Sequence, residues 1–157
     1  MNWLSFLCKF ASQTLNIVNH LESIQAPVKG ELKQFAEMFS AALCHDNPLL
    51  NFALQHLKNR TGKQMRPLMV LLCARLTGQV NEAVLHAAVA LELLHTASLV
   101  HDDVVDESDC RRGQLSVNAL TNNKVAVLVG DYLLSVALMH GLVRDAQGRK
   151  MSKSLGN

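Results

Sequence analysis

Three aspartates that could bind a metal stand together in the segment HDDVVDES at 101–108: Asp102, Asp103 and Asp106. Positions 102 and 106 are four apart, so a helix would place both carboxylates on one face. Such close carboxylates repel, and near the carboxyl end of a helix the dipole adds to the cost. Mg²⁺ prefers carboxylate oxygens and is typically held by one or two carboxylates together with phosphate oxygens. The spacing favours a magnesium site over the alternative of a solvated acidic helix end.

Basic residues lie on both sides of this acidic cluster in the sequence. Lys63 and Arg66 belong to a loop around Gly62, and Arg111 and Arg112 follow the aspartates after a short turn. Arginine suits bidentate recognition of phosphate, and lysine adds a point charge. Either basic group alone is more simply a solvated surface. Together with the carboxylates, these basic residues indicate a diphosphate ligand. The carboxylates would bind it through a metal, and the basic residues would contact its phosphates directly.

The composition predicts that helices position these residues. The chain has 157 residues, of which 49% are hydrophobic and 4% aromatic, with three prolines. Its apolar runs are longer than a strand, so we expect an all-α fold with one aliphatic core. Helical spacing predicts helices over 2–23, 31–44, 48–59, 67–77, 81–105 and 124–139, with breaks at 26–30, around Gly62 and at 106–114. The segment 81–105 is apolar nearly all round and is expected to be central.

Charge and cysteine content limit the classes of partner and compartment. The net charge of +2 is too small to indicate a nucleic acid partner. The four cysteines include no Cys-x-x-Cys pair, which favours free thiols in a reducing cytosol. No run reaches about 18 uninterrupted apolar residues, so we expect no transmembrane segment. The start of the chain lacks a basic residue before its apolar run and is interpreted as an amphipathic helix, which predicts a cytoplasmic protein.

Three segments together resemble the trans-polyprenyl diphosphate synthases, which elongate isoprenyl chains head to tail. They are GKQMRP at 62–67, ELLHTASLVHDDVVDESDCRRG at 92–113 and VAVLVGDYLLS at 125–135. The resemblance covers about residues 10–139. It implies an isoprenoid-synthase-type helical bundle around a central cavity, truncated here, in a homo- or hetero-oligomer. The chain is therefore expected to comprise a partial synthase domain at 1–139 and a different tail at 140–157.

The resemblance also implies a role for each matching residue. The aspartate-rich motif would bind Mg²⁺ that bridges the allylic prenyl diphosphate, and Arg111 would contact the same diphosphate. Isopentenyl diphosphate would be held through its diphosphate by Lys63, Arg66, His95 and Arg112. The implied reaction adds isopentenyl diphosphate to the allylic substrate after the allylic diphosphate has departed.

His95 has two interpretations from the sequence. A histidine in an apolar helix is more often a satisfied core residue than a ligand. However, His95 precedes Asp102 by seven residues, which is two helical turns, so both share a face. Together with the resemblance, this favours phosphate contact.

Two small residues on the same helix predict the length of the product. Ser98 and Ala97 lie four and five residues before Asp102 and are expected along the cavity wall. A bulky aromatic side chain there would close the tunnel, whereas small side chains leave it open. We therefore predict a long-chain all-trans product, and we expect phenylalanine at either position to shorten it.

The second aspartate-rich motif of the family does not occur in this sequence. After Asp106 the acidic residues are Glu107, Asp109, Asp131 and Asp145. The metal cluster would thus need carboxylates from elsewhere, so the chain alone is expected to be inactive and to expose apolar surface to a partner. The alternative is a non-catalytic helical subunit that pairs with another chain.

The tail at 140–157, HGLVRDAQGRKMSKSLGN, resembles a different family. It is similar to the KMSKS region of class I aminoacyl-tRNA synthetases of the valyl type, whose second lysine, here Lys153, acts on the phosphates of ATP. The partner motif H-x-G-H does not occur in the chain. We expect the tail to be an irregular basic loop, and a synthetase fragment is an alternative supported by the tail only.

Overall fold

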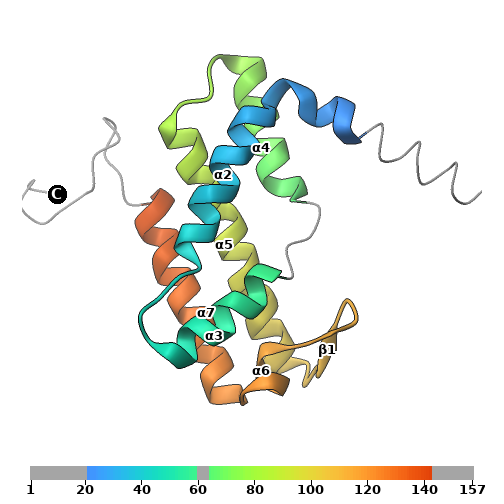
Figure 1. Ribbon diagram of the computed structural model, residues 1–157, viewed down its shortest axis with the longest axis vertical. Coiled ribbons are helices and arrows are strands. Elements are labelled where there is room, and N and C mark those ends of the chain that lie inside the picture. The colour runs from blue at the N-terminus through green and yellow to red at the C-terminus, as the bar shows by residue number, and fades with distance from the viewer. Residues whose placement is uncertain (1–20, 60–63, 143–157) are drawn as a thin grey trace, which may run out of the picture.

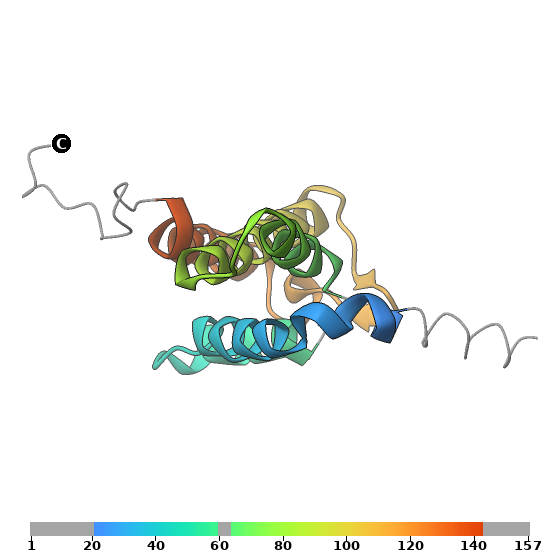
Figure 2. The same ribbon diagram turned by 90° about the horizontal axis from the view of Figure 1, so that it is seen from above.

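The computed structural model describes residues 21–59 and 64–142, the last two by their backbone only. Its longer helices are α2 (Lys29–Ala42), α3 (Pro48–Asn59), α4 (Met65–Thr77), α5 (Glu82–Val105) and α7 (Asn123–Ala137). The shorter elements are η1 (Ala26–Val28), α6 (Val117–Leu120), η2 (Leu138–Leu142) and a hairpin of β1 (Cys110–Arg111) and β2 (Gln114–Leu115). Figure 1 shows α5 running through the length of this bundle, and Figure 2 shows α2 and α3 forming a layer beside that of α4, α5 and α7.

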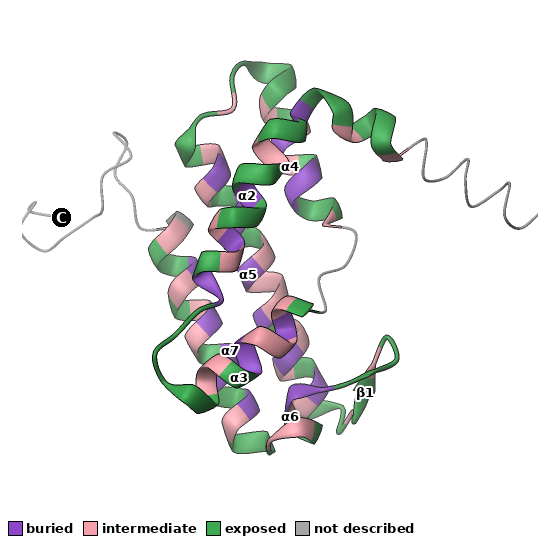
Figure 3. Ribbon diagram, viewed as in Figure 1, coloured by how far each residue is buried: buried purple, intermediate pink, exposed green. Residues whose placement is uncertain are grey.

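Helix α5 is the centre of the core, as the sequence predicts. The Asn81 side chain caps it by accepting a hydrogen bond from the Val84 amide, at 3.0 Å. The helix packs against α7, α4 and α2, and its buried residues include Val89, Leu93 and Ala97. Figure 3 shows such buried residues along the faces where the helices meet. The all-α prediction is confirmed, since the hairpin is the only sheet in the part of the chain described.

By length and composition alone, α5 is also apolar enough to cross a membrane. This helix of 24 residues has a most apolar window that is 39% buried among the other helices. The sequence analysis expected no transmembrane segment because it looked for uninterrupted apolar runs. The mean hydropathy of α5 is high even though the helix contains a few polar residues. A central core helix has the same composition, because it is apolar on most sides.

The sequence missed or misplaced three local features. The predicted break at 26–30 is a short 3-10 turn, and α2 already begins at Lys29. Helix α4 begins at Met65, before Pro67, because a proline in the first helical turn interrupts no backbone hydrogen bond. The predicted turn at 106–114 contains the hairpin, and α6 follows with Ser116 as its cap.

Helices α5 and α7 make their close approach at Gly130. A Cβ at this position would overlap the His101 ring. The Nε2 of His101 lies 3.3 Å from the carbonyl oxygen of Val127 and 3.4 Å from Oδ1 of Asp131. Gly130 therefore leaves room for a histidine that links α5 to α7 just before the aspartate-rich motif.

Gly130→Ala should destabilise the fold by about 1–3 kcal/mol, because the added methyl group overpacks the α5–α7 contact. Gly30→Ala is the matched control, since a Cβ there meets nothing within 4 Å and alanine is the better helix former. Urea denaturation of both variants measures the two effects. Equal free energies of unfolding would show that the His101 ring moves aside without cost.

Candidate active site

A partly open cavity of about 450 Å³ lies beside α5, and residues of α4 and of the hairpin contribute to its wall. Helices α2 and α3 contribute Phe39 and Leu57 to its wall. The other apolar lining residues are Met65, Leu99 and Val100. The polar lining residues are Gln64, Arg66, Glu92, His95, Thr96, Asp103, Arg111 and Arg112. The cavity thus combines three arginines with an apolar floor, a combination suited to an anionic group on a hydrocarbon chain.

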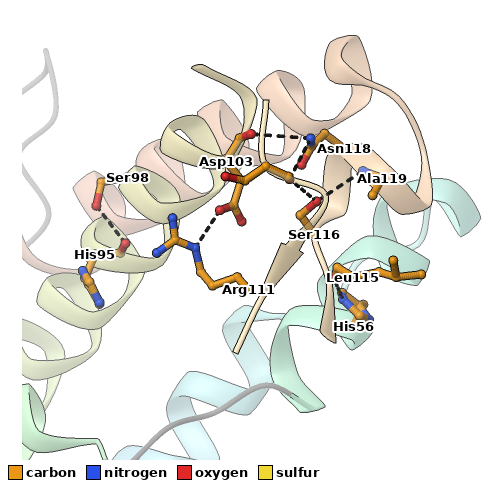
Figure 4. A network of polar contacts seen from close by, with 10 residues as sticks. His56, His95, Ser98, Asp103, Arg111, Leu115, Ser116, Asn118 and Ala119 are labelled. Carbon is orange, nitrogen blue, oxygen red and sulfur yellow. Dashed lines mark hydrogen bonds and ion pairs between the residues drawn. The ribbon is translucent and has the colours of Figure 1, made fainter. Parts of the chain in front are cut away.

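Asp103 and Arg111 form the shortest ion pair of the site. The Arg111 Nε donates a hydrogen bond of 2.6 Å to Oδ1 of Asp103, whose side chain is 4% exposed against 32% for Arg111 (Figure 4). The backbone of Asp103 also accepts from the amide of Ser108, at 2.9 Å. This pair fixes the hairpin to the carboxyl end of α5.

Further hydrogen bonds hold the hairpin against the helices. The Ser116 hydroxyl donates to the carbonyl oxygen of Ser108 at 2.7 Å, and the Asn118 amide donates to the same oxygen at 3.2 Å (Figure 4). On the α3 side, Nε2 of His56 donates to the carbonyl oxygen of Leu115 at 2.7 Å. The position of the hairpin is thereby fixed on two sides.

The hairpin turn places Arg112 in an unusual backbone conformation. Arg112 has φ 53° and Gly113 has φ 78°, so both central residues of the turn are left-handed. This conformation matches the twist of a two-residue hairpin, but an arginine adopts it at a cost that glycine does not have. In this conformation Arg112 lines the cavity together with Arg111.

The aspartate-rich motif divides into two exposed carboxylates and one buried one. Asp102 and Asp106 are exposed, and Asp106 is the residue that ends α5. Asp103 is 3% exposed and lines the cavity. Among the described residues, no group of three or more His, Cys, Asp or Glu is arranged to hold a metal ion. Asp103 therefore differs from Asp102 and Asp106 in its surroundings, because it is buried and pairs with Arg111.

His95 lies in the cavity wall, where its surroundings favour the neutral ring. Burial lowers the pKa of His95, and the charges of Arg66, Arg112 and Arg111 lower it further, whereas Asp102 opposes them. The sequence predicted this residue to be near the diphosphate. It shares the cavity with the basic residues that the prediction grouped with it.

Glu92 is a cavity residue that the sequence analysis missed. Burial raises its pKa, and the charges of Arg66 and Arg112 oppose that shift. Its Oε2 atom is buried and has no hydrogen-bond partner among the described residues. Its place one helical turn before His95 could have indicated it, since residues three apart lie on neighbouring positions of a helix surface.

The structure brings together Arg66, His95, Arg111 and Arg112 of the predicted diphosphate contacts around one cavity. Lys63 and Lys153 lie outside the described residues, as does the tail from 143 onward. The π-helical turn η2 continues the helical path of α7 to Leu142, past the predicted start of the tail at 140.

Ala97 and Ser98, predicted to line the product tunnel, have different surroundings. Ala97 is 0% exposed within the core. Ser98 is exposed, and its hydroxyl donates to the carbonyl oxygen of His95 at 2.8 Å. Neither residue lines the cavity described above.

Phenylalanine at these two positions should therefore have different effects on stability. Ser98→Phe should change the free energy of unfolding by less than about 0.5 kcal/mol, as is usual for a surface substitution. Ala97→Phe should cost about 1–3 kcal/mol, because the ring overpacks the core. Thermal unfolding of both variants measures this difference, and similar midpoints would contradict the placement of Ala97. Product length should be tested with Ser98→Phe, where a folding defect does not interfere.

Comparison with known proteins identifies relatives of this chain. The model of the polyprenyl synthetase family matches residues 47–150. The chain is 41% identical over 123 residues to an all-trans-nonaprenyl-diphosphate synthase (geranyl-diphosphate specific) of Rhodobacter capsulatus, covering 76% of this chain and 37% of that protein. It is 40% identical over 118 residues to heptaprenyl diphosphate synthase component 2 of Geobacillus stearothermophilus, covering 75% of this chain and 37% of that one.

A solved structure with the same arrangement of helices is a polyprenyl synthase from Caulobacter crescentus, complexed with calcium and isoprenyl diphosphate. Its TM-score is 0.71 with 32% sequence identity, over 75% of this chain and 36% of that one. The chain thus has the isoprenoid-synthase helical fold over the part that matches. It spans about 37% of the length of the curated relatives it matches.

Proposed function

This chain belongs to the polyprenyl synthetase family, and from that premise we propose that its cavity binds the diphosphate of isopentenyl diphosphate. The observation that carries the proposal is the grouping of Arg66, His95 and Arg112 around one partly apolar cavity. Arginines that meet a diphosphate there can form charge-assisted, bidentate hydrogen bonds. The apolar residues around them suit the hydrocarbon part of the ligand and exclude water from it.

The allylic prenyl diphosphate is proposed to bind beside the exposed Asp102 and Asp106, through Mg²⁺. Within residues 21–59 and 64–142, neither carboxylate forms an ion pair, so both are available to a cation. Their spacing on one helical face fits a hard cation held by two carboxylates and completed by phosphate oxygens. When bound, Mg²⁺ supplies Lewis-acid stabilisation of the departing diphosphate.

Arg111 is proposed to lie between the two substrates. Its Nε is bound to Asp103, which leaves the position of the guanidinium fixed by a buried carboxylate. A guanidinium held in this way is oriented before a phosphate arrives, which reduces the entropy lost on binding. We assign Asp103 the role of positioning Arg111, and we assign the metal contacts to Asp102 and Asp106.

Synthesis of a long-chain all-trans polyprenyl diphosphate is proposed for an assembly that contains this chain. The sequence given has a single D-D-x-x-D motif, and we propose that the assembly supplies carboxylates beyond this motif. The relative named component 2 of heptaprenyl diphosphate synthase supports a partner subunit. Cytoplasmic localisation stays a prediction.

The proposal is tested by calorimetric titration of the chain with isopentenyl diphosphate. Isopentenyl alcohol, which lacks the diphosphate, is the matched control ligand. We expect saturable binding of the diphosphate only. At a concentration a hundredfold above its Kd, the ligand should stabilise the fold by about 2.7 kcal/mol. Equal binding of the alcohol, or no binding of the diphosphate, would contradict the proposed site.

A further inference from the structure

Glu92 is the one acidic residue in the cavity wall that has no ion-pair partner among the described residues. The other cavity carboxylate, Asp103, is bound to Arg111. Glu92 lies in the same wall as Arg66 and Arg112, and its Oε2 is buried without a hydrogen-bond partner in that part of the chain. A buried carboxylate oxygen without a hydrogen bond costs free energy, so this atom needs an explanation.

The titratable and charged groups that share the cavity with Glu92 come from three elements. They are Arg66 from α4, His95 and Asp103 from α5, and Arg111 and Arg112 from the hairpin. Helices α2 and α3 contribute Phe39 and Leu57, which do not titrate. Among the described residues, positive charge therefore dominates in the cavity wall around Glu92.

An anion in the cavity would reverse this balance. Burial raises the pKa of Glu92, and the charges of Arg66 and Arg112 act against that shift. A diphosphate that engages these arginines would neutralise their effect and add negative charge beside the carboxylate. Both changes favour the protonated acid, so the pKa of Glu92 would rise further in the complex.

We propose that Glu92 is a proton-linked positioning residue, which binds one proton from solvent when a diphosphate enters the cavity. The bound anion then faces a neutral carboxyl group, and Arg66 and Arg112 bind the diphosphate instead of interacting with the charge of Glu92. The inference rests on the proposed function, since it needs a diphosphate in this cavity. By linkage, an increase in pH that removes this proton must weaken binding.

Calorimetric titration of the full chain with isopentenyl diphosphate, in buffers of different ionisation enthalpy, measures the protons taken up. Glu92→Gln keeps the size of the side chain and imitates the neutral acid, so it should take up fewer protons than the wild type. The difference should be largest between the pKa of Glu92 in the free chain and its pKa in the complex, where a shift of one pKa unit gives about half a proton. Since one pKa unit corresponds to a factor of ten, Glu92→Gln should bind up to about tenfold more tightly near neutral pH.

Two further variants separate this effect from other titrations. His95 also lies in the cavity and could take up a proton, so the comparison is repeated with His95→Gln in both backgrounds; the Glu92-dependent difference should persist. Glu92→Asp should restore the proton uptake. The ligand titrates identically in every variant and cancels in the comparison.

The outcomes separate this inference from the function on which it rests. Equal proton uptake by wild type and Glu92→Gln, or weaker binding by Glu92→Gln with an unchanged thermal midpoint, overturns the role of Glu92 while the diphosphate site stands. Absence of binding by the wild type at every pH overturns both.

Discussion

Asp103→Ala should lower the free energy of unfolding by about 3 kcal/mol, the lower end of the range for breaking a buried ion pair. The lower end applies because Arg111 is 32% exposed and regains water when its partner is lost, whereas Asp103 is 4% exposed. The loss should be concentrated in the hairpin, since the pair joins β1 to α5. Urea denaturation gives the total change, and hydrogen exchange at the Ser108 and Ser116 amides shows where it occurs.

Asp102→Ala is the matched control, because it removes the same group from the adjacent residue of the same helix. Asp102 is exposed, so this variant should change stability by no more than about 0.5 kcal/mol in the absence of metal. A double-mutant cycle with Arg111→Ala isolates the energy of the pair. Similar losses for the two aspartates would show that Asp103 does not hold the hairpin.

The helices were predictable from the sequence where the pattern is local. The long apolar run at 82–105 and its Asn81 cap define α5, which ends just before Asp106. Helix α3 ends at Asn59 and α4 begins at Met65, as the expected break between them requires. These features depend on residues close together in the chain. The sequence therefore predicted the central helix, the cluster of aspartates at its end and the basic residues near it.

The hairpin was not predictable in the same way. Its turn depends on left-handed backbone at Arg112 and Gly113, and the Arg-Gly pair is a weaker turn signal than Asn-Gly. Its position depends on hydrogen bonds of Asp103, Ser116 and His56, and the one between His56 and Leu115 joins residues 59 positions apart in the sequence. Tertiary contacts thus decide that Asp103 is buried while its neighbour Asp102 is exposed.

Dependence on tertiary contacts also explains why the sequence analysis missed Glu92. It explains as well why Ala97 and Ser98 do not line the cavity as predicted. Glu92 gains its significance from Arg66 and Arg112, which other elements bring to it. Ala97 and Ser98 are adjacent on a helix and so point in different directions, one into the core and one outward. Spacing along one helix does not show which of its sides faces the cavity.

Replacing Asp102 and Asp106 together by asparagine should remove the dependence of allylic diphosphate binding on Mg²⁺. The two exposed carboxylates supply the negative charge that attracts the cation, and asparagine keeps their size but not that charge. With the wild type, farnesyl diphosphate at a hundredfold excess over its Kd should stabilise the fold by about 2.7 kcal/mol with Mg²⁺ present. In the double variant this stabilisation should disappear.

Thermal unfolding with farnesyl diphosphate, with Mg²⁺ and with a chelator, measures the effect. Asp109→Asn is the matched control, since it removes a nearby exposed carboxylate beside the hairpin and should keep the dependence on Mg²⁺. Isopentenyl diphosphate should still bind the double variant, because its proposed contacts with Arg66 and Arg112 do not need the metal. If both ligands lose binding together, the two diphosphates share one site, and the separation of metal-bridged from direct contacts is wrong.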